Sequence, residues 1–546
     1  MRSTLIAVVV ALAIGVTGTS VRAQQKRFAG TAAAKAEFDK GKTLEVSNDW
    51  TGAAAAYKRA WTIDPEFADA WDAYTWARHR DALGDISKLG KETPEERKAL
   101  QARVAAKEAA LEKEFTDLVS AHPKAPIYLW AKAQLFNETD IDLQGKLCSD
   151  AVALDPKFTP GYRCVATVAG VRGDMDAAAA ALRQVMAIDG ESPELWLRLA
   201  RSLRESPAKY KAITDELIAR LPKTDTAAQA YELWAESLPV KERIAAFEKL
   251  IADYPPQQFK STLSGAMWLF ALYDDAAPKK AATLAHTIAT ALPADKEWAA
   301  KVKYVDTLAE AEKKAETDGV AALALLKTVK APSYVSTQRV LLATAKAQDQ
   351  AGKLTDAYGD LLKAFAPTPG PRLEPALYAY GKRLNKDAAI VDKEVWALRT
   401  AAAKPAVPFS LESFLDGTQV SLSDYKGKVV LVDFWFPNCG PCRGSFPLLE
   451  RLYQKHKAEG LIYLGINGLE KQDPQVMPLW KSVGYSFTPL KANEKWAEEV
   501  YGVRGYPTTF YIGADQQTYF KTHVYDETTF AIADMQLTAL LKASKK

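Results

Sequence analysis

The 546-residue sequence predicts a multidomain protein in which an all-α solenoid is followed by a smaller α/β domain. The length exceeds what a single hydrophobic core supports. From about residue 38 to residue 402, apolar residues recur at spacings of three and four, which is the period of a helix. After residue 401 the pattern changes to short apolar strands that alternate with helical segments, as in an α/β fold.

The first residues have the features of a secretory signal. A positively charged start precedes the apolar stretch Leu5–Val16, and the segment Val21–Ala23 offers small residues for cleavage before Gln24. The stretch is shorter than the roughly 20 residues that span a bilayer. We therefore expect a signal peptide over 1–23 and an exported, periplasmic or otherwise extracytoplasmic protein without a membrane span after cleavage. Retention of the segment as an anchor stays open.

Charge and composition exclude some functions. The formal net charge is only +4, from 71 basic and 67 acidic residues, and 48% of the residues are hydrophobic. No basic run with interleaved aromatic residues occurs, so the sequence gives no support for nucleic-acid binding. Four cysteines are few for an exported chain, so disulfides are not expected to hold the whole fold together.

Residues 24–400 contain a degenerate repeat. Small, large and small residues followed by proline stand at the same offsets in two distant places: Ala53, Tyr57, Ala60 and Pro65, and again Ala357, Leu361, Ala364 and Pro369. Two Leu-Asp or Ile-Asp steps, at 154–155 and 188–189, are 34 residues apart. This pattern resembles the tetratricopeptide repeat, a helix–turn–helix unit. We predict an α-solenoid of about ten repeats whose concave face binds peptides or partner proteins.

One helix in this region is expected to be unusually long. Thr93 precedes Pro94, and Glu96 follows three residues after Thr93, which is the signature of a capped helix start. The helical pattern then continues to about Ser120.

Cys148 and Cys164 lie almost equally far from the turn at Asp155-Pro156. On two antiparallel helices their side chains meet across the hairpin, and a disulfide there stabilises the fold by about 3 kcal/mol. A structural disulfide and two buried free thiols both remain open. Neither cysteine has a catalytic pattern.

Residues 401–546 form the predicted second domain, after a linker at Ala401–Pro405. Asp416-Gly417 lies between two short apolar runs and predicts a β-hairpin. The expected strands and helices then alternate along the chain: strands 429–435, 461–466, 508–512 and 517–523, and helices 441–457, 474–482, 494–500 and 527–542.

The motif Cys439-Gly440-Pro441-Cys442 directly follows the first of these strands. At a helix start, unpaired backbone N–H groups and the helix dipole favour an anion, so Cys439 should ionise below the free-thiol pKa of about 8.5. Cys442, one turn further on, can then attack a mixed disulfide at Cys439. A zinc site needs four ligands, and the other cysteines lie almost three hundred residues upstream. We expect redox chemistry and neither a metal nor a cofactor.

The predicted second domain, residues 401–546, resembles the TlpA/ResA-like thioredoxin family of exported thiol–disulfide reductases. Five segments carry the resemblance: Pro408-Phe409, Asp416-Gly417, Lys426-Gly427-Lys428, Asp433-Phe434-Trp435 leading to Cys439–Arg443, and Tyr501–Thr509. The resemblance implies a thioredoxin-like fold over 401–546 and a protein-disulfide reductase. It makes Cys439 the attacking and Cys442 the resolving thiol, and it makes Pro507 the cis-proline beside the dithiol. Asp433 matches the buried acid, whose raised pKa suits it to carry the proton of Cys442.

Two positions depart from the family. Asn438 stands before the first cysteine, where tryptophan is usual, and Ser445 stands where some of these reductases carry a glutamate. The second departure leaves Asp433 as the expected proton carrier. Two alternatives to a reductase are an assembly scaffold with a redox-regulated or vestigial domain, and a thiol peroxidase, whose Pro-x-x-x-Thr-x-x-Cys arrangement is absent. The sequence specifies neither the disulfide-bearing protein substrate nor the thiol electron donor.

Overall fold

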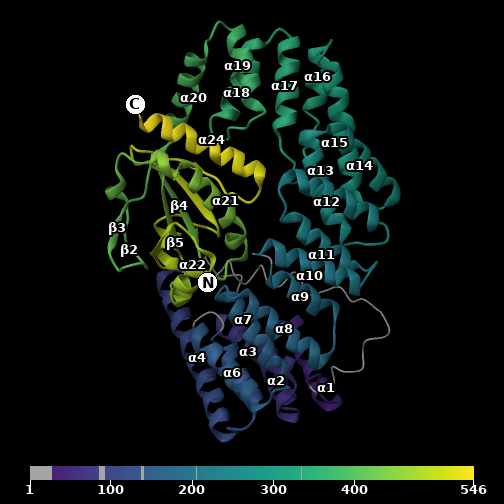
Figure 1. Cartoon of the computed structure of the whole chain (residues 1–546), viewed down its shortest axis with the longest axis vertical. Helices are drawn as coiled ribbons and strands as arrows, with labels where there is room; N and C mark the ends of the chain where they lie inside the picture. Colours follow the sequence, from purple (N-terminus) through teal and green to yellow (C-terminus); the bar gives the residue numbers. More distant parts are fainter. Residues whose placement is uncertain (1–27, 85–92, 137–139, 204–205, 334, 546) are drawn as a thin grey trace. The chain divides into compact units, whose positions relative to one another are not determined.

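The computed structural model describes residues 28–84, 93–136, 140–203, 206–333 and 335–545 (Figure 1). The predicted signal segment 1–23 lies outside the described residues. By their internal contacts, the residues form two compact units, one of residues up to 205 with Lys471–Val483, the other of Ser206–Glu470 with Gly484–Lys546. Across the described ranges, no helix is both long and apolar enough to cross a membrane.

Among its described residues, the first unit contains helices and no strand. Its helices are α1 (Ala32–Val46), α2 (Trp50–Ile63), α3 (Ala68–Leu83), α4 (Pro94–Ala121), α5 (Pro126–Gln134), α6 (Ile141–Leu154), α7 (Thr159–Val171), α8 (Met175–Asp189), α9 (Pro193–Ser202) and α22 (Asp473–Val483). The expected long helix is α4. Its start is the predicted capping box, in which the Glu96 N–H donates to Thr93 Oγ1 at 3.2 Å and the Thr93 N–H donates to Glu96 Oε2 at 2.8 Å.

Close packing of small against large residues joins neighbouring helices of this unit. A Cβ added to Gly41 of α1 would lie 2.4 Å from the ring of Tyr57 of α2, so only glycine lets the two helices approach this closely. Ala53, Tyr57 and Ala60 of the repeat pattern are fully buried. Trp61 and Trp71 stack with ring centroids 4.0 Å apart. The small-large-small pattern thus marks the helix contact, as the sequence predicts.

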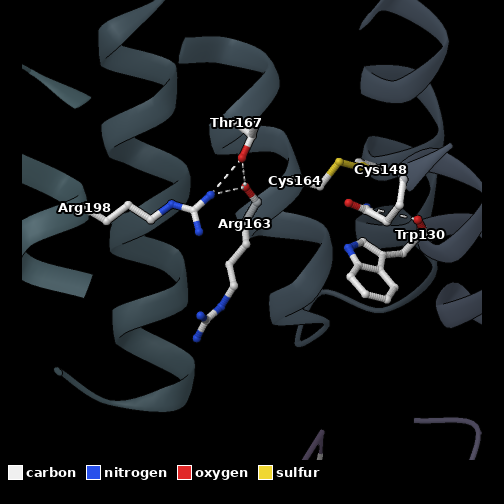
Figure 2. Close-up of a disulfide and its surroundings, with 7 residues drawn as sticks. Trp130, Cys148, Arg163, Cys164, Thr167 and Arg198 are labelled. Atoms are coloured by element: carbon white, nitrogen blue, oxygen red, sulfur yellow. Dashed lines mark hydrogen bonds between the residues drawn. A yellow bond between two sulfur atoms is a disulfide. The ribbon is translucent and has the colours of Figure 1, made fainter. Parts of the chain in front are cut away.

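A disulfide links Cys148 of α6 to Cys164 of α7 across the turn between these helices (Figure 2). Their Cα atoms are 6.0 Å apart, and both residues are buried. On the other side of α7, Arg198 of α9 donates to Thr167 Oγ1 at 2.8 Å (Figure 2). The disulfide joins α6 to α7, and the hydrogen bond joins α7 to α9.

The second unit begins with eleven further helices. They are α10 (Pro207–Arg220), α11 (Asp225–Glu236), α12 (Val240–Asp253), α13 (Thr262–Ala276), α14 (Pro278–Ala291), α15 (Lys296–Lys314), α16 (Gly319–Leu326), α17 (Gln338–Gln350), α18 (Leu354–Phe365), α19 (Leu373–Arg383) and α20 (Ala388–Ala402). A buried polar cluster joins three of them. Asp274 of α13 accepts hydrogen bonds from Tyr304 of α15 at 2.8 Å and from Arg339 of α17 at 2.6 Å.

The α/β part of the second unit confirms the predicted fold class. It contains β1 (Lys404–Pro405), β2 (Ser410–Glu412), β3 (Gln419–Ser421), β4 (Val430–Trp435), α21 (Gly440–His456), β5 (Ile462–Asn467), β6 (Thr488–Lys491), α23 (Glu494–Glu499), β7 (Thr508–Ile512), β8 (Gln517–Lys521) and α24 (Glu527–Ser544). Short 3-10 helices span Leu422–Tyr425 and Lys457–Glu459, and a third, Glu470–Gln472, lies at the boundary between the residues assigned to the two units.

The six-stranded sheet has the order β1-β8-β7-β4-β5-β6. Strand β4 pairs parallel to β5 and antiparallel to β7, so the segment that leads to the dithiol is central. The predicted hairpin is β2–β3, in which Leu411 faces Val420. Strand β6 was not predicted, because it contains Pro489, and proline cannot donate to a ladder; its position at the sheet edge explains why proline is tolerated.

The two faces of β4 carry different side chains, since successive residues of a strand point to opposite sides. Val430, Val432 and Phe434 belong to a buried apolar cluster with residues of β5, β6 and α23. Trp435 lies on the other face and packs edge-on against Phe446 of α21, with ring centroids 5.1 Å apart. Asp433 shares this second face, which α21 covers.

The predicted linker Ala401–Pro405 is ordered. Helix α20 ends at Ala402, and Lys404–Pro405 form β1, which pairs with β8. Trp396 of α20 stacks on Tyr519 of β8 at 5.2 Å. The last solenoid helix is therefore packed against the sheet domain and runs directly into its edge.

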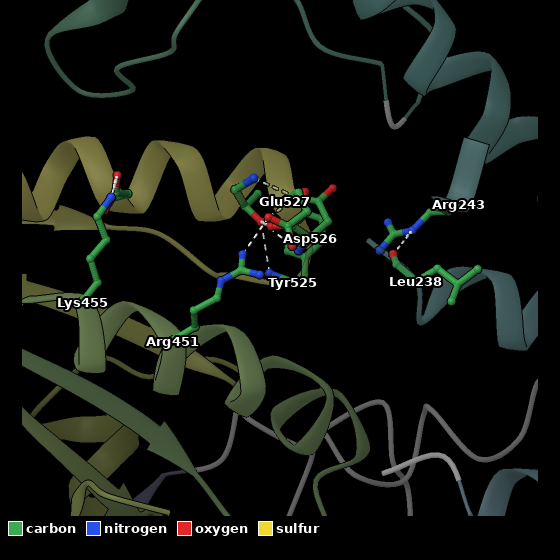
Figure 3. Close-up of polar contacts among 9 residues, drawn as sticks. Leu238, Arg243, Arg451, Lys455, Tyr525, Asp526 and Glu527 are labelled. Atoms are coloured by element: carbon green, nitrogen blue, oxygen red, sulfur yellow. Dashed lines mark hydrogen bonds and ion pairs between the residues drawn. The ribbon is translucent and has the colours of Figure 1, made fainter. Parts of the chain in front are cut away.

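Ion pairs hold α21 against α24. Figure 3 shows Arg451 of α21 paired with Glu527 in the first turn of α24, at 2.6 Å. One turn later, Lys455 Nζ lies 2.7 Å from Asp534. The buried ring of His456 lies 2.8 Å from Asp534 and 2.9 Å from Glu459. These contacts fix the helix that begins at the dithiol.

Candidate active site

Cys439 and Cys442 lie where the central strand passes into a helix. All six residues of β4 are buried, and Cys439 is the N-cap of α21, with Pro441 in the first turn. The Cys439 N–H donates to the carbonyl of Phe436 at 3.0 Å, and the Cys442 N–H donates to Cys439 Sγ at 3.2 Å. A sulfur at this position receives both a backbone N–H and the positive end of the helix dipole, which favour its thiolate form.

The structure holds the pair in the oxidised form. A disulfide joins Cys439 to Cys442, and their Cα atoms are 5.2 Å apart. Cys442 is fully buried, whereas Cys439 keeps 4% of its surface exposed, and the neighbouring Gly440 and Pro441 are exposed. Only the first cysteine is thus open to an incoming thiol or disulfide, and its access is narrow in this oxidised form.

Asp433 is a fully buried acid on β4. Its Oδ1 accepts a hydrogen bond from Thr509 Oγ1 at 2.7 Å, and its Oδ2 has no hydrogen-bond partner within the described part of the chain. Burial raises the pKa of Asp433 to about 7, and the Thr509 hydrogen bond partly offsets this. A carboxyl group with this pKa exchanges a proton near neutral pH, as a general acid or base must.

Pro507 follows Tyr506 through a cis peptide bond, just before β7. The Tyr506 hydroxyl donates to the carbonyl of Gly468 at 3.1 Å, and its ring packs edge-on against Phe436 at 5.2 Å. Phe436 also accepts the hydrogen bond from the Cys439 N–H. The proline loop and the segment that leads to the dithiol are therefore held by the same aromatic contact.

Ser445 occupies the position at which some relatives carry a glutamate. It is buried, and its hydroxyl donates to the carbonyl of Cys442 at 2.8 Å. The side chain thus satisfies the backbone of α21 and carries no exchangeable carboxyl proton, which leaves Asp433 as the acid on this face.

Three residues of this site were not predicted as site residues from the sequence. Thr509 contacts Asp433, and Tyr506 and Phe436 hold the proline loop. In the sequence, Tyr506 and Thr509 belong to the matching segment Tyr501–Thr509, and Thr509 also lies in a predicted strand. The contact of Thr509 depends on the register between β7 and β4, in which it faces Asp433. Within the described ranges, no group of three or more His, Cys, Asp or Glu side chains is arranged to hold a metal ion.

Comparison with known proteins agrees with this geometry. Residues 401–537 match the Redoxin family. This segment is a Redoxin domain. The thioredoxin-like protein YneN of Bacillus subtilis is 38% identical over 107 residues, which are 19% of this chain and 61% of that protein. The thiol-disulfide oxidoreductase ResA of Bacillus subtilis is 32% identical over 100 residues, 18% of this chain and 55% of that protein.

Among solved structures, a thiol:disulfide interchange protein of the thioredoxin family from Chlorobium tepidum is 26% identical, with a TM-score of 0.23. That match covers 26% of this chain and 97% of the other. The chain spans 55–61% of the length of the two curated relatives. The resemblance drawn from the sequence is thus confirmed for the Redoxin domain, and the preceding region is helical, as predicted.

Proposed function

We propose that the protein is an exported thiol–disulfide oxidoreductase that acts as a protein-disulfide reductase. The proposal rests chiefly on one observation: the Cys439–Cys442 pair lies at the start of α21, after a buried strand, with only Cys439 reaching the surface. We assign the Redoxin module to residues 401–546 and a partner-recruiting helical module to residues 24–400. Export rests on the signal pattern of residues 1–23.

The proposed cycle begins with the reduced dithiol. The Cys439 thiolate attacks a substrate disulfide, forms a Cys439–substrate bond and releases one substrate thiolate. Asp433 takes the proton of Cys442, and the resulting thiolate attacks Cys439 Sγ. This step breaks the Cys439–substrate bond, releases the second substrate thiolate and forms the Cys439–Cys442 disulfide. Two electrons thus pass to the substrate, and an external dithiol donor restores the enzyme by the reverse exchange.

The order of attack follows from exposure. Cys442 is fully buried in the first turn of α21, so a bulky disulfide can reach only Cys439. Extended substrate backbone would lie against the loop of Tyr506 and Pro507, which is packed beside Phe436. The helical region supplies no chemistry in this cycle and serves to bring a donor or substrate to the dithiol.

Insulin reduction tests the proposal. With dithiothreitol as donor, we expect the purified protein to precipitate reduced insulin chains, Cys439→Ser to abolish this activity, and Cys442→Ser to accumulate a mixed disulfide with the substrate. Ser445→Ala is the matched control in the same helix turn and should retain activity. Equal insulin reduction by the wild type and Cys439→Ser would refute the assignment. Unchanged function of a Cys439→Ser/Cys442→Ser variant in the native host would favour a scaffold instead.

A further inference from the structure

We propose that Thr509 is a positioning residue for the dithiol reaction: its hydroxyl holds Oδ1 of Asp433, so that Oδ2 alone exchanges the proton of Cys442. This inference rests on the proposed function and deepens it. It assigns a role to the last residue of the Tyr501–Thr509 segment, for which the sequence alone suggests no function.

The contact is built into the central sheet. Asp433 of β4 and Thr509 of β7 are direct cross-strand partners, and their side chains meet at 2.7 Å. Asp433 is fully buried, and Thr509 keeps 1% of its surface. A threonine hydroxyl has one proton to donate, and here it is directed at the carboxyl group.

The two carboxyl oxygens are consequently different. Oδ1 accepts the Thr509 proton, while Oδ2 has no partner among the described residues although it is buried. A buried polar atom without a protein partner is costly, and a redox or catalytic role is one explanation for it. On the face of β4 that α21 covers, the proton of Cys442 is the one that the reaction must remove.

The hydroxyl also adjusts how readily the carboxyl group ionises. Burial raises the pKa of Asp433, and the hydrogen bond from Thr509 lowers it. Tyr463 of β5 and Tyr511 of β7 are titratable groups on this face, and their pKa values are raised by burial first and by the charge of Asp433 second. The helix α21 that covers the face also buries His456, which pairs with Asp534 and Glu459. The buried residues of α24 carry no charge. Both tyrosines therefore stay neutral, and Thr509 is the polar contact that favours ionised Asp433.

Removing the hydroxyl should trap the proton. In Thr509→Val, Asp433 loses the donor that stabilises its charged form, so its titration midpoint should rise by about one to two pH units. At neutral pH, the carboxyl group then already holds a proton and cannot accept one from Cys442. Formation of the intramolecular disulfide from the mixed disulfide should slow about tenfold at pH 7 and recover at higher pH.

The experiment follows the Asp433 carboxyl stretch by infrared difference spectroscopy between pH 5 and 10 in the reduced full-length protein, with Asp433→Asn to assign the band. Single-turnover insulin reduction is measured in parallel. Thr509→Ser should restore the wild-type midpoint. Thr508→Val is the matched control, because the buried Thr508 hydroxyl donates to the Gly505 carbonyl instead, at 2.7 Å. It should leave the midpoint unchanged.

The outcomes separate the two claims. An unmoved midpoint in Thr509→Val, with an active enzyme, overturns the positioning role and leaves the reductase intact. A further loss of rate when Thr509→Val is added to Asp433→Asn also overturns it, because the threonine would then act independently of the acid. If the wild type reduces no disulfide, the proposed function fails, and the role in proton transfer fails with it.

Discussion

Replacing Asp433 by asparagine should stabilise the protein above neutral pH, although the residue is part of the proposed site. The carboxyl group is fully buried, and its pKa is raised from 3.8 to about 7, chiefly by burial. In the unfolded chain the same group ionises near pH 4. Asparagine has almost the same shape and keeps an oxygen that can accept the Thr509 hydroxyl, but it never acquires a charge.

The sign of this stability change follows from the number of protons that the folded and unfolded states bind. Between about pH 4 and pH 7 the folded protein holds a proton on Asp433 that the unfolded chain has lost, so unfolding releases this proton. The free energy of unfolding therefore falls as the pH rises through this window and is constant above it. A pKa difference of about three units corresponds to about 4 kcal/mol in total, of which about 2.5 kcal/mol lies between pH 5 and pH 8. The asparagine variant should lack this decrease.

Hydrogen exchange of the β4 peptide measures the effect where it arises. Exchange rates corrected for their intrinsic pH dependence give the opening free energy of this strand, for the wild type and for Asp433→Asn at pH 5, 6, 7 and 8. Asp356→Asn, at an exposed position of α18, controls for the loss of one charge. If the wild type and Asp433→Asn show the same dependence on pH, the carboxyl group does not titrate in this window, and its proposed part in proton transfer loses its basis.

Two further predictions concern the helical region. The Cys148→Ser/Cys164→Ser variant should lose about 3 kcal/mol of unfolding free energy, because the disulfide closes a loop between residues 16 apart, while insulin reduction per folded molecule is unchanged; equal urea midpoints would contradict this. Gly41→Ala should destabilise α1 against α2 by about 1–3 kcal/mol, because the added Cβ meets the Tyr57 ring at 2.4 Å, whereas Gly359→Ala, which meets nothing within 4 Å, should gain up to about 1 kcal/mol. Thermal melting of both glycine variants checks the pair, and similar shifts would show that α1 yields to the contact.

Much of the fold follows from local patterns that the sequence states directly. The capping signature at Thr93 gives the start of α4, and the Asp416-Gly417 turn gives the β2–β3 hairpin with the expected pairing. Local patterns do not predict strand β6, because Pro489 disfavours a strand. The proline is tolerated only because β6 lies at the edge of the sheet. Strand β1 is not predicted either, because two residues are too few to show an alternating pattern. It forms only by pairing with β8.

The site likewise contains residues that local motifs predict and one that depends on long-range strand pairing. Cys439, Cys442 and Pro507 are visible in the sequence because their chemistry depends on short spacings and on a motif. Thr509 is not, because its partner lies 76 residues earlier, and only the antiparallel register of β7 on β4 brings the two side chains together. A slip of one residue would turn the threonine hydroxyl to the opposite face and leave Asp433 buried without a donor. The register of two central strands therefore sets the hydrogen bonding of the buried acid, and under the proposed mechanism it also sets the pH at which the dithiol completes its cycle.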